Sequence, residues 1–123
     1  MQIGIDVGAT KIESVVLEDS GKEQHRSRTD CPKDYNLILS AIKDINSSLE
    51  NTFKKKLPIG VCHPGIHSPQ TGLVKNAPNC FWLEKKPFQQ DLRKLLNKEV
   101  FCENDANCFA LSEAIDGAAK HYK

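Results

Sequence analysis

The sequence predicts an α/β fold in which helices cover a mixed sheet. Two patterns predict it: residues 2–29 hold three strand-like segments in succession, and later apolar residues adopt helical spacing between short apolar runs. The length of 123 residues, with 39% hydrophobic and 27% charged residues, suits a globular chain with one core. We therefore expect one domain built from a three-strand antiparallel meander followed by alternating helices and strands.

The meander is predicted from three neighbouring segments. Residues 2–7 form a short strand, and residues 10–17, rich in β-branched side chains, form the second. Residues 19–21 (Asp-Ser-Gly) make a turn into residues 23–29, whose polar character is typical of an exposed edge strand.

The rest of the chain alternates between helix and strand. Apolar side chains repeat at helical spacing after Pro32, namely Leu37, Ile38, Ala41, Ile42, Ile45 and Leu49. Residues 59–62 form a strand that ends at His63-Pro64-Gly65, and a hairpin over residues 69–72 is expected in the loop-rich stretch that follows. Pro87 starts a second helix with Phe88 and Leu92 on its apolar face, residues 100–103 form a strand, and residues 106–114 form a last helix closed by Gly117.

Charge and cysteine usage exclude several classes of function. Lys and Arg number 17 against 16 Asp and Glu, and the longest run of like charge is residues 54–56, so we expect neither a nucleic-acid nor a membrane partner. The lysine run is read as a solvated turn. The apolar start is too short for a secretory leader, which predicts a cytoplasmic protein. The five cysteines lack the spacing of a disulfide framework or a zinc site, so buried reduced thiols are expected.

A first candidate site lies in residues 6–11 (Asp-Val-Gly-Ala-Thr-Lys), at a tight turn between strands. Small residues let backbone N–H groups approach phosphate oxygens, Thr10 and Lys11 supply a hydroxyl and a charge, and Asp6 suits a hydrated Mg²⁺. The order of residues excludes a Walker loop and a dinucleotide fingerprint. A plain glycine-containing hairpin turn remains the alternative.

A second candidate site is the polar cluster of residues 103–107 (Glu-Asn-Asp-Ala-Asn), where a strand meets a helix. One such residue is explained by an N-cap. Several together suit a carboxylate that accepts the proton of a substrate hydroxyl, with a neighbouring Asn that orients this hydroxyl.

Other residues that often carry chemistry receive structural interpretations. Cys62 and His63 are neighbours on a strand and point to opposite faces, so they do not form a dyad. The remaining histidines, His25, His67 and His121, are expected at the surface, and Trp82 is expected to anchor a core or loop.

The motifs together resemble the ROK family of sugar kinases and repressors. The stretches GIDVGATKIESVVL, TGLVKNAP and ENDANCFALSEAIDGAA carry the resemblance, which spans residues 2–119 and is nearest to the bacterial fructokinase (manno-fructokinase) branch. It implies an actin-like, ribonuclease-H-like ATPase lobe over residues 1–119, with residues 120–123 as a tail toward a second lobe. The family's second phosphate motif, Glu-x-Gly-His sugar motif, zinc site and adenosine pocket have no counterpart in these residues.

The resemblance also implies residue roles and a reaction. Asp105 matches the family's catalytic base, and Ala9 stands where a Gly is more frequent. The positions that match sugar contacts are Gly65, Asn76, Asn104 and Asp105, and those that match the phosphate motif are Asp6, Gly8, Thr10 and Lys11, with Asp6 on Mg²⁺ through water. The implied reaction is ATP-dependent phosphorylation of a hexose, fructose to fructose 6-phosphate first, with an N-acetylhexosamine or other hexose as the alternative.

Further readings stay open beside this one. A sugar-sensing regulator and an inactive remnant are remote alternatives. The isolated lobe is expected to be inactive, and a homodimer of the full-length protein is among the open options.

Overall fold

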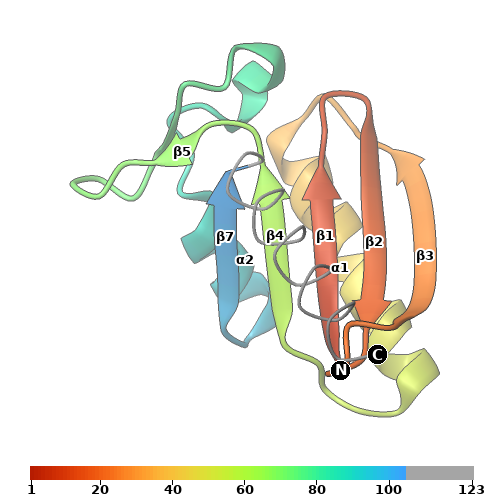
Figure 1. Ribbon diagram of the computed structural model, residues 1–123. Coiled ribbons are helices and arrows are strands. Elements are labelled where there is room, and N and C mark those ends of the chain that lie inside the picture. Colours follow the sequence, from red (N-terminus) through yellow and green to blue (C-terminus); the bar gives the residue numbers. More distant parts are fainter. Residues whose placement is uncertain (105–123) are drawn as a thin grey trace.

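The computed structural model describes residues 1–104, apart from the side chains of residues 78 and 79. Its centre is a five-stranded sheet of order β3-β2-β1-β4-β7, and α1 and α2 lie against the same face of that sheet (Figure 1). The sheet contains β1 (Gln2–Val7), β2 (Lys11–Leu17), β3 (Glu23–Asp30), β4 (Ile59–His63) and β7 (Val100–Asn104), and the helices are α1 (Tyr35–Phe53) and α2 (Phe88–Leu96). The predicted α/β order is confirmed, whereas the helix expected over residues 106–114, its Gly117 cap and His121 lie outside the described residues.

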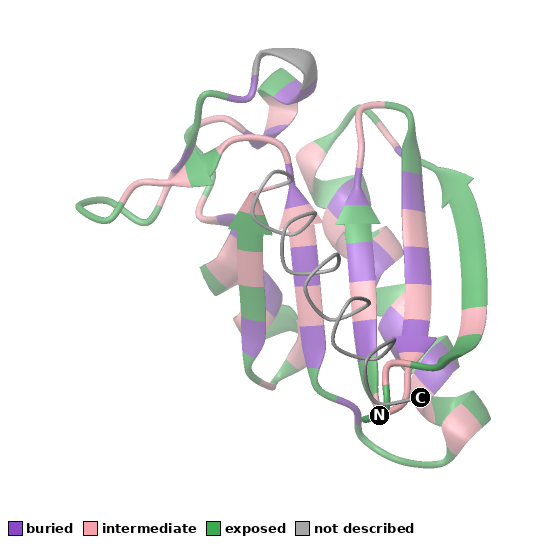
Figure 2. Cartoon of the chain, in the orientation of Figure 1, coloured by how far each residue is buried: buried purple, intermediate pink, exposed green. Residues whose placement is uncertain are grey.

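The meander forms because alternate residues of its strands are apolar. β1 pairs antiparallel with β2, with Ile3 opposite Val16 and Val7 opposite Ile12. These side chains are at most 1% exposed and face the helices, while β3 is almost entirely exposed at the sheet edge (Figure 2). The predicted edge strand is therefore confirmed.

The other half of the sheet is parallel. β1 pairs parallel with β4, and β4 pairs parallel with β7, each through a connection that contains a helix. The carboxyl ends of β1, β4 and β7 consequently lie along one edge of the sheet, which we call the carboxyl edge (Figure 1). The first candidate site and the described part of the second, Glu103 and Asn104, are at strand ends on this edge.

The helix α1 faces the sheet with a slightly different stripe from the predicted one. Asp34 caps it by accepting a hydrogen bond from the Leu37 N–H at 3.0 Å. Ile38 and Ile42 are fully buried, but Leu37 is 57% exposed, so the apolar face is centred one position later than its four-residue spacing indicates. None of the described helices combines the length and apolar character that crossing a bilayer requires.

A half-buried lysine, Lys98, connects the C-terminal ends of the two helices to the segment before β4. The Lys98 ammonium donates to Glu50 Oε2 at 3.0 Å and also to Asn46 Oδ1 and the Leu57 carbonyl. Glu50 in turn accepts from the Leu57 N–H at 2.8 Å. Desolvation favours a higher pKa for Glu50, but the hydrogen bonds from Leu57 and Lys98 outweigh it and lower that pKa. The network ties the residue before Pro58, where the chain enters β4, to α1 and to the segment after α2.

Candidate active site

The turn between β1 and β2 has the small residues and unpaired donors of an anion site. The Gly8 N–H donates to the Lys11 carbonyl at 2.8 Å, and a Cβ placed on Gly8 would lie 3.1 Å from that oxygen. Within residues 1–104, no acceptor takes the N–H groups of Ala9 and Thr10. Left-handed backbone among the described non-glycine residues falls elsewhere, so Ala9 replaces glycine without strain.

Two charged side chains flank this turn. The Asp6 carboxylate points away from the helix-covered face, and partial desolvation raises its pKa without a compensating hydrogen bond from the described residues. A carboxylate of this kind fits a hydrated Mg²⁺, although no group of three ligands that would hold an ion outright occurs in the described part of the chain. Lys11 forms an ion pair with Asp30, and both side chains are exposed, so the ammonium exchanges partners at little cost.

The loop after β4 brings Gly65 and Asn76 together. Gly65 has φ +78°, and a Cβ placed on it would lie 2.5 Å from the Lys75 carbonyl and 3.3 Å from the Asn76 carbonyl carbon. Asn76 is itself left-handed, with φ 61°. Only glycine allows the two backbones to approach this closely, which explains why the two predicted sugar positions adjoin.

A small hairpin holds this loop. β5 (Ile66–His67) pairs antiparallel with β6 (Val74–Lys75), as the turn residues of the sequence predicted, and it projects beyond the carboxyl edge (Figure 1). On its other side β6 bonds to the chain before α2, because the Lys85 N–H donates to the Val74 carbonyl at 2.7 Å. The Glu84 carboxylate accepts from the Ala77 N–H at 3.0 Å. Asn76 is therefore bracketed by hydrogen bonds on both sides.

Strand register sets how far apart the two candidate sites lie. Asp6 pairs with Cys62, and Cys62 pairs with Glu103, so the three residues form one row across β1, β4 and β7. Two strand spacings put Asp6 about 10 Å from Glu103. Asn104 follows Glu103 and is the register partner of His63. Asp105, the predicted base, lies outside the described residues.

Two histidines, His63 and His67, lie at this edge. The structure confirms the predicted alternation of Cys62 and His63 and contradicts the predicted exposure of His67. His63 is 0% exposed on the helix side of β4, and its strand neighbour Cys62 faces the other side, as alternation predicted. His67, expected at the surface, is half-buried, with its ring centroid 4.8 Å from that of His63. The prediction for His67 was wrong because the short hairpin folds the residue back against β4.

Burial also governs the charge of these imidazoles. Desolvation lowers the pKa of His63, against smaller opposing effects of the Pro64 carbonyl and Glu103. Desolvation and the neighbouring His63 lower the pKa of His67 to about 4. Both rings are therefore neutral near pH 7.

The segment before α2 shields this loop from the far side. η1 (Pro78–Leu83), a 3-10 helix that the sequence pattern did not predict, carries Cys80 and Leu83 into the core. Trp82 is half-buried against Phe81, with ring centroids 5.1 Å apart, which confirms its expected role as a loop anchor. Cys31, Cys80 and Cys102 are reduced thiols, as expected, whereas Cys62 is disulfide-bonded, so the expectation of reduced thiols was wrong for Cys62.

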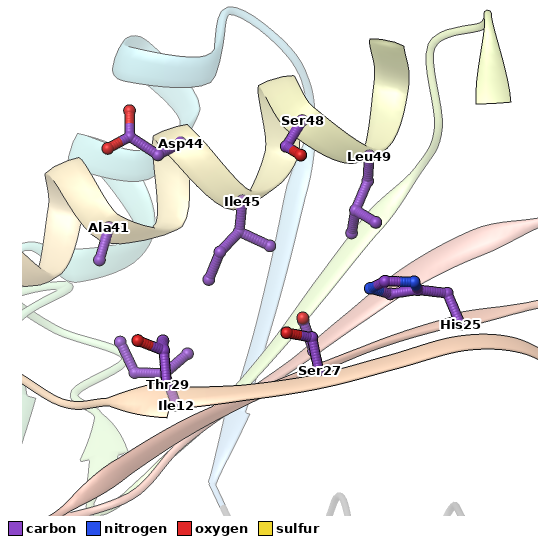
Figure 3. Close-up of a pocket in the computed structure, with 10 residues that line it drawn as sticks. Ile12, His25, Ser27, Thr29, Ala41, Asp44, Ile45, Ser48 and Leu49 are labelled. Atoms are coloured by element: carbon purple, nitrogen blue, oxygen red, sulfur yellow. The ribbon is translucent and has the colours of Figure 1, made fainter. Parts of the chain in front are cut away.

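A groove of about 370 Å³ lies between α1 and β3, away from the carboxyl-edge loops. Figure 3 shows His25, Ser27 and Thr29 on β3 facing Ala41 and Ile45 on α1 across this groove. His25, which was expected at the surface, lines this groove and is half-buried. The groove forms because the side of β3 that faces α1 carries polar side chains. None of the predicted site residues lines it.

Similarity to known proteins agrees with this geometry. Proteins named N-acetyl-D-glucosamine kinase from Mannheimia succiniciproducens and Pasteurella multocida are each 38% identical over 123 residues, 99% of this chain and 40% of the relative. The chain thus spans about 40% of the length of these relatives.

Solved structures share the fold as well. A polyphosphate/ATP-glucomannokinase from Arthrobacter matches with a TM-score of 0.81 and 29% identity over 96% of this chain and 49% of its own. A ROK family glucokinase from Streptomyces griseus, solved with glucose and AMPPNP, matches with a TM-score of 0.76 and 25% identity over 89% of this chain and 34% of its own. The expected actin-like ATPase fold is confirmed by these neighbours. Residues 2–123 match the ROK family pattern, and the chain belongs to the ROK family.

Proposed function

We propose that this chain forms part of an ATP-dependent hexose kinase. The observation that carries the proposal is the arrangement at the carboxyl edge, where a turn with free N–H groups on β1 lies one strand away from the Gly65–Asn76 loop on β4. Phosphoryl transfer needs a phosphate site and a hydroxyl site side by side. Kinase relatives over nearly the whole chain support the same reading.

For the acceptor sugar we propose N-acetyl-D-glucosamine before fructose. The 38% identical relatives are named N-acetyl-D-glucosamine kinases, which favours the N-acetylhexosamine alternative over the fructokinase branch that the motifs resemble. Fructose remains the second candidate.

The proposed mechanism assigns each half of the edge one task. The N–H groups of Ala9 and Thr10, with the Lys11 ammonium, would hold phosphate oxygens of ATP, and Asp6 would hold a hydrated Mg²⁺, which when bound would neutralise phosphate charge. The remaining residues act on the sugar. Its hydroxyls are bound by the backbone at Gly65 and by Asn76 and Asn104, and Asp105 accepts the proton of the attacking hydroxyl.

A sugar panel tests this proposal. ADP release is measured with ATP and either N-acetyl-D-glucosamine, N-acetylmannosamine, glucose, mannose or fructose, using the longest reading frame that contains this chain. We expect kcat/KM to be highest for N-acetyl-D-glucosamine. Preference for fructose would reverse the choice of acceptor, and turnover of none of the sugars would contradict the kinase proposal.

A further inference from the structure

His63 occupies an unusual place at the end of β4. Its side chain is 0% exposed, with the His67 ring 4.8 Å and the Phe88 ring 5.6 Å away between centroids, both nearly perpendicular to it. Nδ1 lies 2.8 Å from the Pro64 carbonyl oxygen. Nε2 is shielded from solvent and has no hydrogen-bond partner among residues 1–104. Burying a polar ring with one nitrogen that makes no hydrogen bond costs folding free energy, so such a group calls for an explanation.

The hydrogen bonds define the proton position on both imidazoles. A carbonyl oxygen only accepts, so His63 carries its proton on Nδ1 and leaves Nε2 bare. His67 Nε2 accepts from the Gln89 N–H at 3.3 Å, so His67 also carries its proton on Nδ1 when neutral. Gln89 Oε1 accepts from the Cys102 N–H at 2.9 Å. Contacts therefore run from the end of β4 through the hairpin and α2 to β7, two residues before Asn104.

We propose that His63 is a positioning residue that sets the conformation of the sugar loop, residues 64–77, through its Nδ1–H bond to Pro64. The proposal rests on the proposed function, because it assigns the loop's purpose to sugar binding. Pro64 precedes Gly65, whose close approach to Lys75 and Asn76 tolerates little rotation of the chain. Fixing the Pro64 carbonyl fixes the direction in which the loop leaves the strand. An apolar side chain of similar size fills the same space but leaves that carbonyl without its donor.

Burial, not charge, keeps the ring of His63 in the neutral form that the proposal requires. The titratable groups that face His63 are His67 on β5, in ring contact with it and neutral near pH 7, and Glu103 on β7, which acts weakly to raise the His63 pKa, while Phe88 on α2 is apolar. Glu103 lies on the opposite side of the sheet, since it pairs with Cys62. A proton on the buried Nε2 would meet no acceptor, so the neutral Nδ1–H form is the one that fits the site.

Three variants of the 123-residue chain test the proposal. H63N places a side-chain N–H where Nδ1 lies, H63Q places its amide where Nε2 lies, and H63L supplies apolar volume only. Amide hydrogen exchange is measured across the chain, and affinities for N-acetyl-D-glucosamine, fructose and ATP are measured by NMR titration. For the loss of one buried hydrogen bond we expect H63L and H63Q to speed exchange in residues 65–76 and weaken sugar binding by about tenfold, with β1, β2 and ATP affinity unchanged. H63N should restore both properties to within about threefold of wild type.

The results separate this inference from the proposed function. Equal defects in H63N and H63L would overturn the positioning role, because the donor would not matter. A nitrogen-detected spectrum of the wild-type chain that showed His63 protonated at Nε2 would overturn it as well, even if a variant failed to fold. The expected exchange pattern together with no binding of either sugar by wild type would support the positioning role of His63 and contradict the proposed function.

Discussion

Gly65 and Gly72 form a matched pair that tests the close approach in the sugar loop. Both are left-handed, with φ +78° and +72°, so alanine at either position costs about 1 kcal/mol in backbone strain. They differ in their surroundings. A Cβ on Gly65 would lie 2.5 Å from the Lys75 carbonyl and 3.0 Å from the Ala77 Cβ, whereas a Cβ on Gly72 meets nothing within 4 Å. Overpacking of this kind adds roughly 1–3 kcal/mol.

We therefore expect Gly65→Ala to lower the free energy of unfolding by about 2–4 kcal/mol and Gly72→Ala by about 1 kcal/mol. Urea unfolding followed by fluorescence measures both, because the chain has one tryptophan and Trp82 lies in η1 beside this loop. Gly65→Ala should also weaken sugar binding, and Gly72→Ala should leave it close to wild type. If the two variants lost equal stability and bound sugar equally well, the contact between Gly65 and the Asn76 segment would not matter as argued.

Four further outcomes follow from the site and the core. Asp105→Asn in the longest reading frame should preserve sugar binding and lower kcat by roughly 10²–10⁴, and steady-state kinetics within threefold of wild type would refute its role as base. Thr10→Val combined with Lys11→Met should raise the KM for ATP and leave the sugar KM nearly unchanged, and the opposite pattern would reverse the assignment of the turn. Lys98→Met should destabilise the chain by about 1–3 kcal/mol, since it removes the donor of Asn46 Oδ1, Glu50 Oε2 and the Leu57 carbonyl, and urea unfolding checks this. The pKa of His67 falls from 6.5 to about 4 on folding, so between these pH values the unfolded chain binds a proton that the folded chain does not. The free energy of unfolding should therefore decline as pH drops from 6.5 toward 4. His67→Gln, which keeps an acceptor for the Gln89 N–H, should flatten that decline.

Much of the fold was predictable because local signals and burial agree. Alternation of apolar residues in β1, β2 and β4 places one side of each strand in the core, and the structure buries the residues expected there. The hairpin was predictable from turn residues, and its Gly72 indeed has positive φ. The helical spacing identified α1 but put its face one residue early, since Leu37 and Ile38 are equally apolar and only packing against the sheet distinguishes them.

The candidate site was predictable in its parts but not in its assembly. The residue types of the motif indicated Asp6 and the turn after it, and the family resemblance implied the two loop positions Gly65 and Asn76. The parallel pairing of β1 with β4 brings them to one edge. The positions of His63 and His67 depend on a fold-back that no residue period encodes. The hydrogen-bond partner of His67 is equally non-local, since His67 bonds to Gln89, which is 22 residues away.

An NMR titration of the labelled 123-residue chain tests the central claim most directly, namely that the carboxyl edge binds a sugar and a nucleotide at separate places. We expect N-acetyl-D-glucosamine or fructose to shift the amides of residues 65–76 and Asn104, with a dissociation constant of about 1 mM or weaker, equivalent to roughly −4 kcal/mol. A non-hydrolysable ATP analogue should instead shift residues 6–11. Sugar shifts confined to the groove between α1 and β3, or no saturable shift with any of these ligands, would contradict the account.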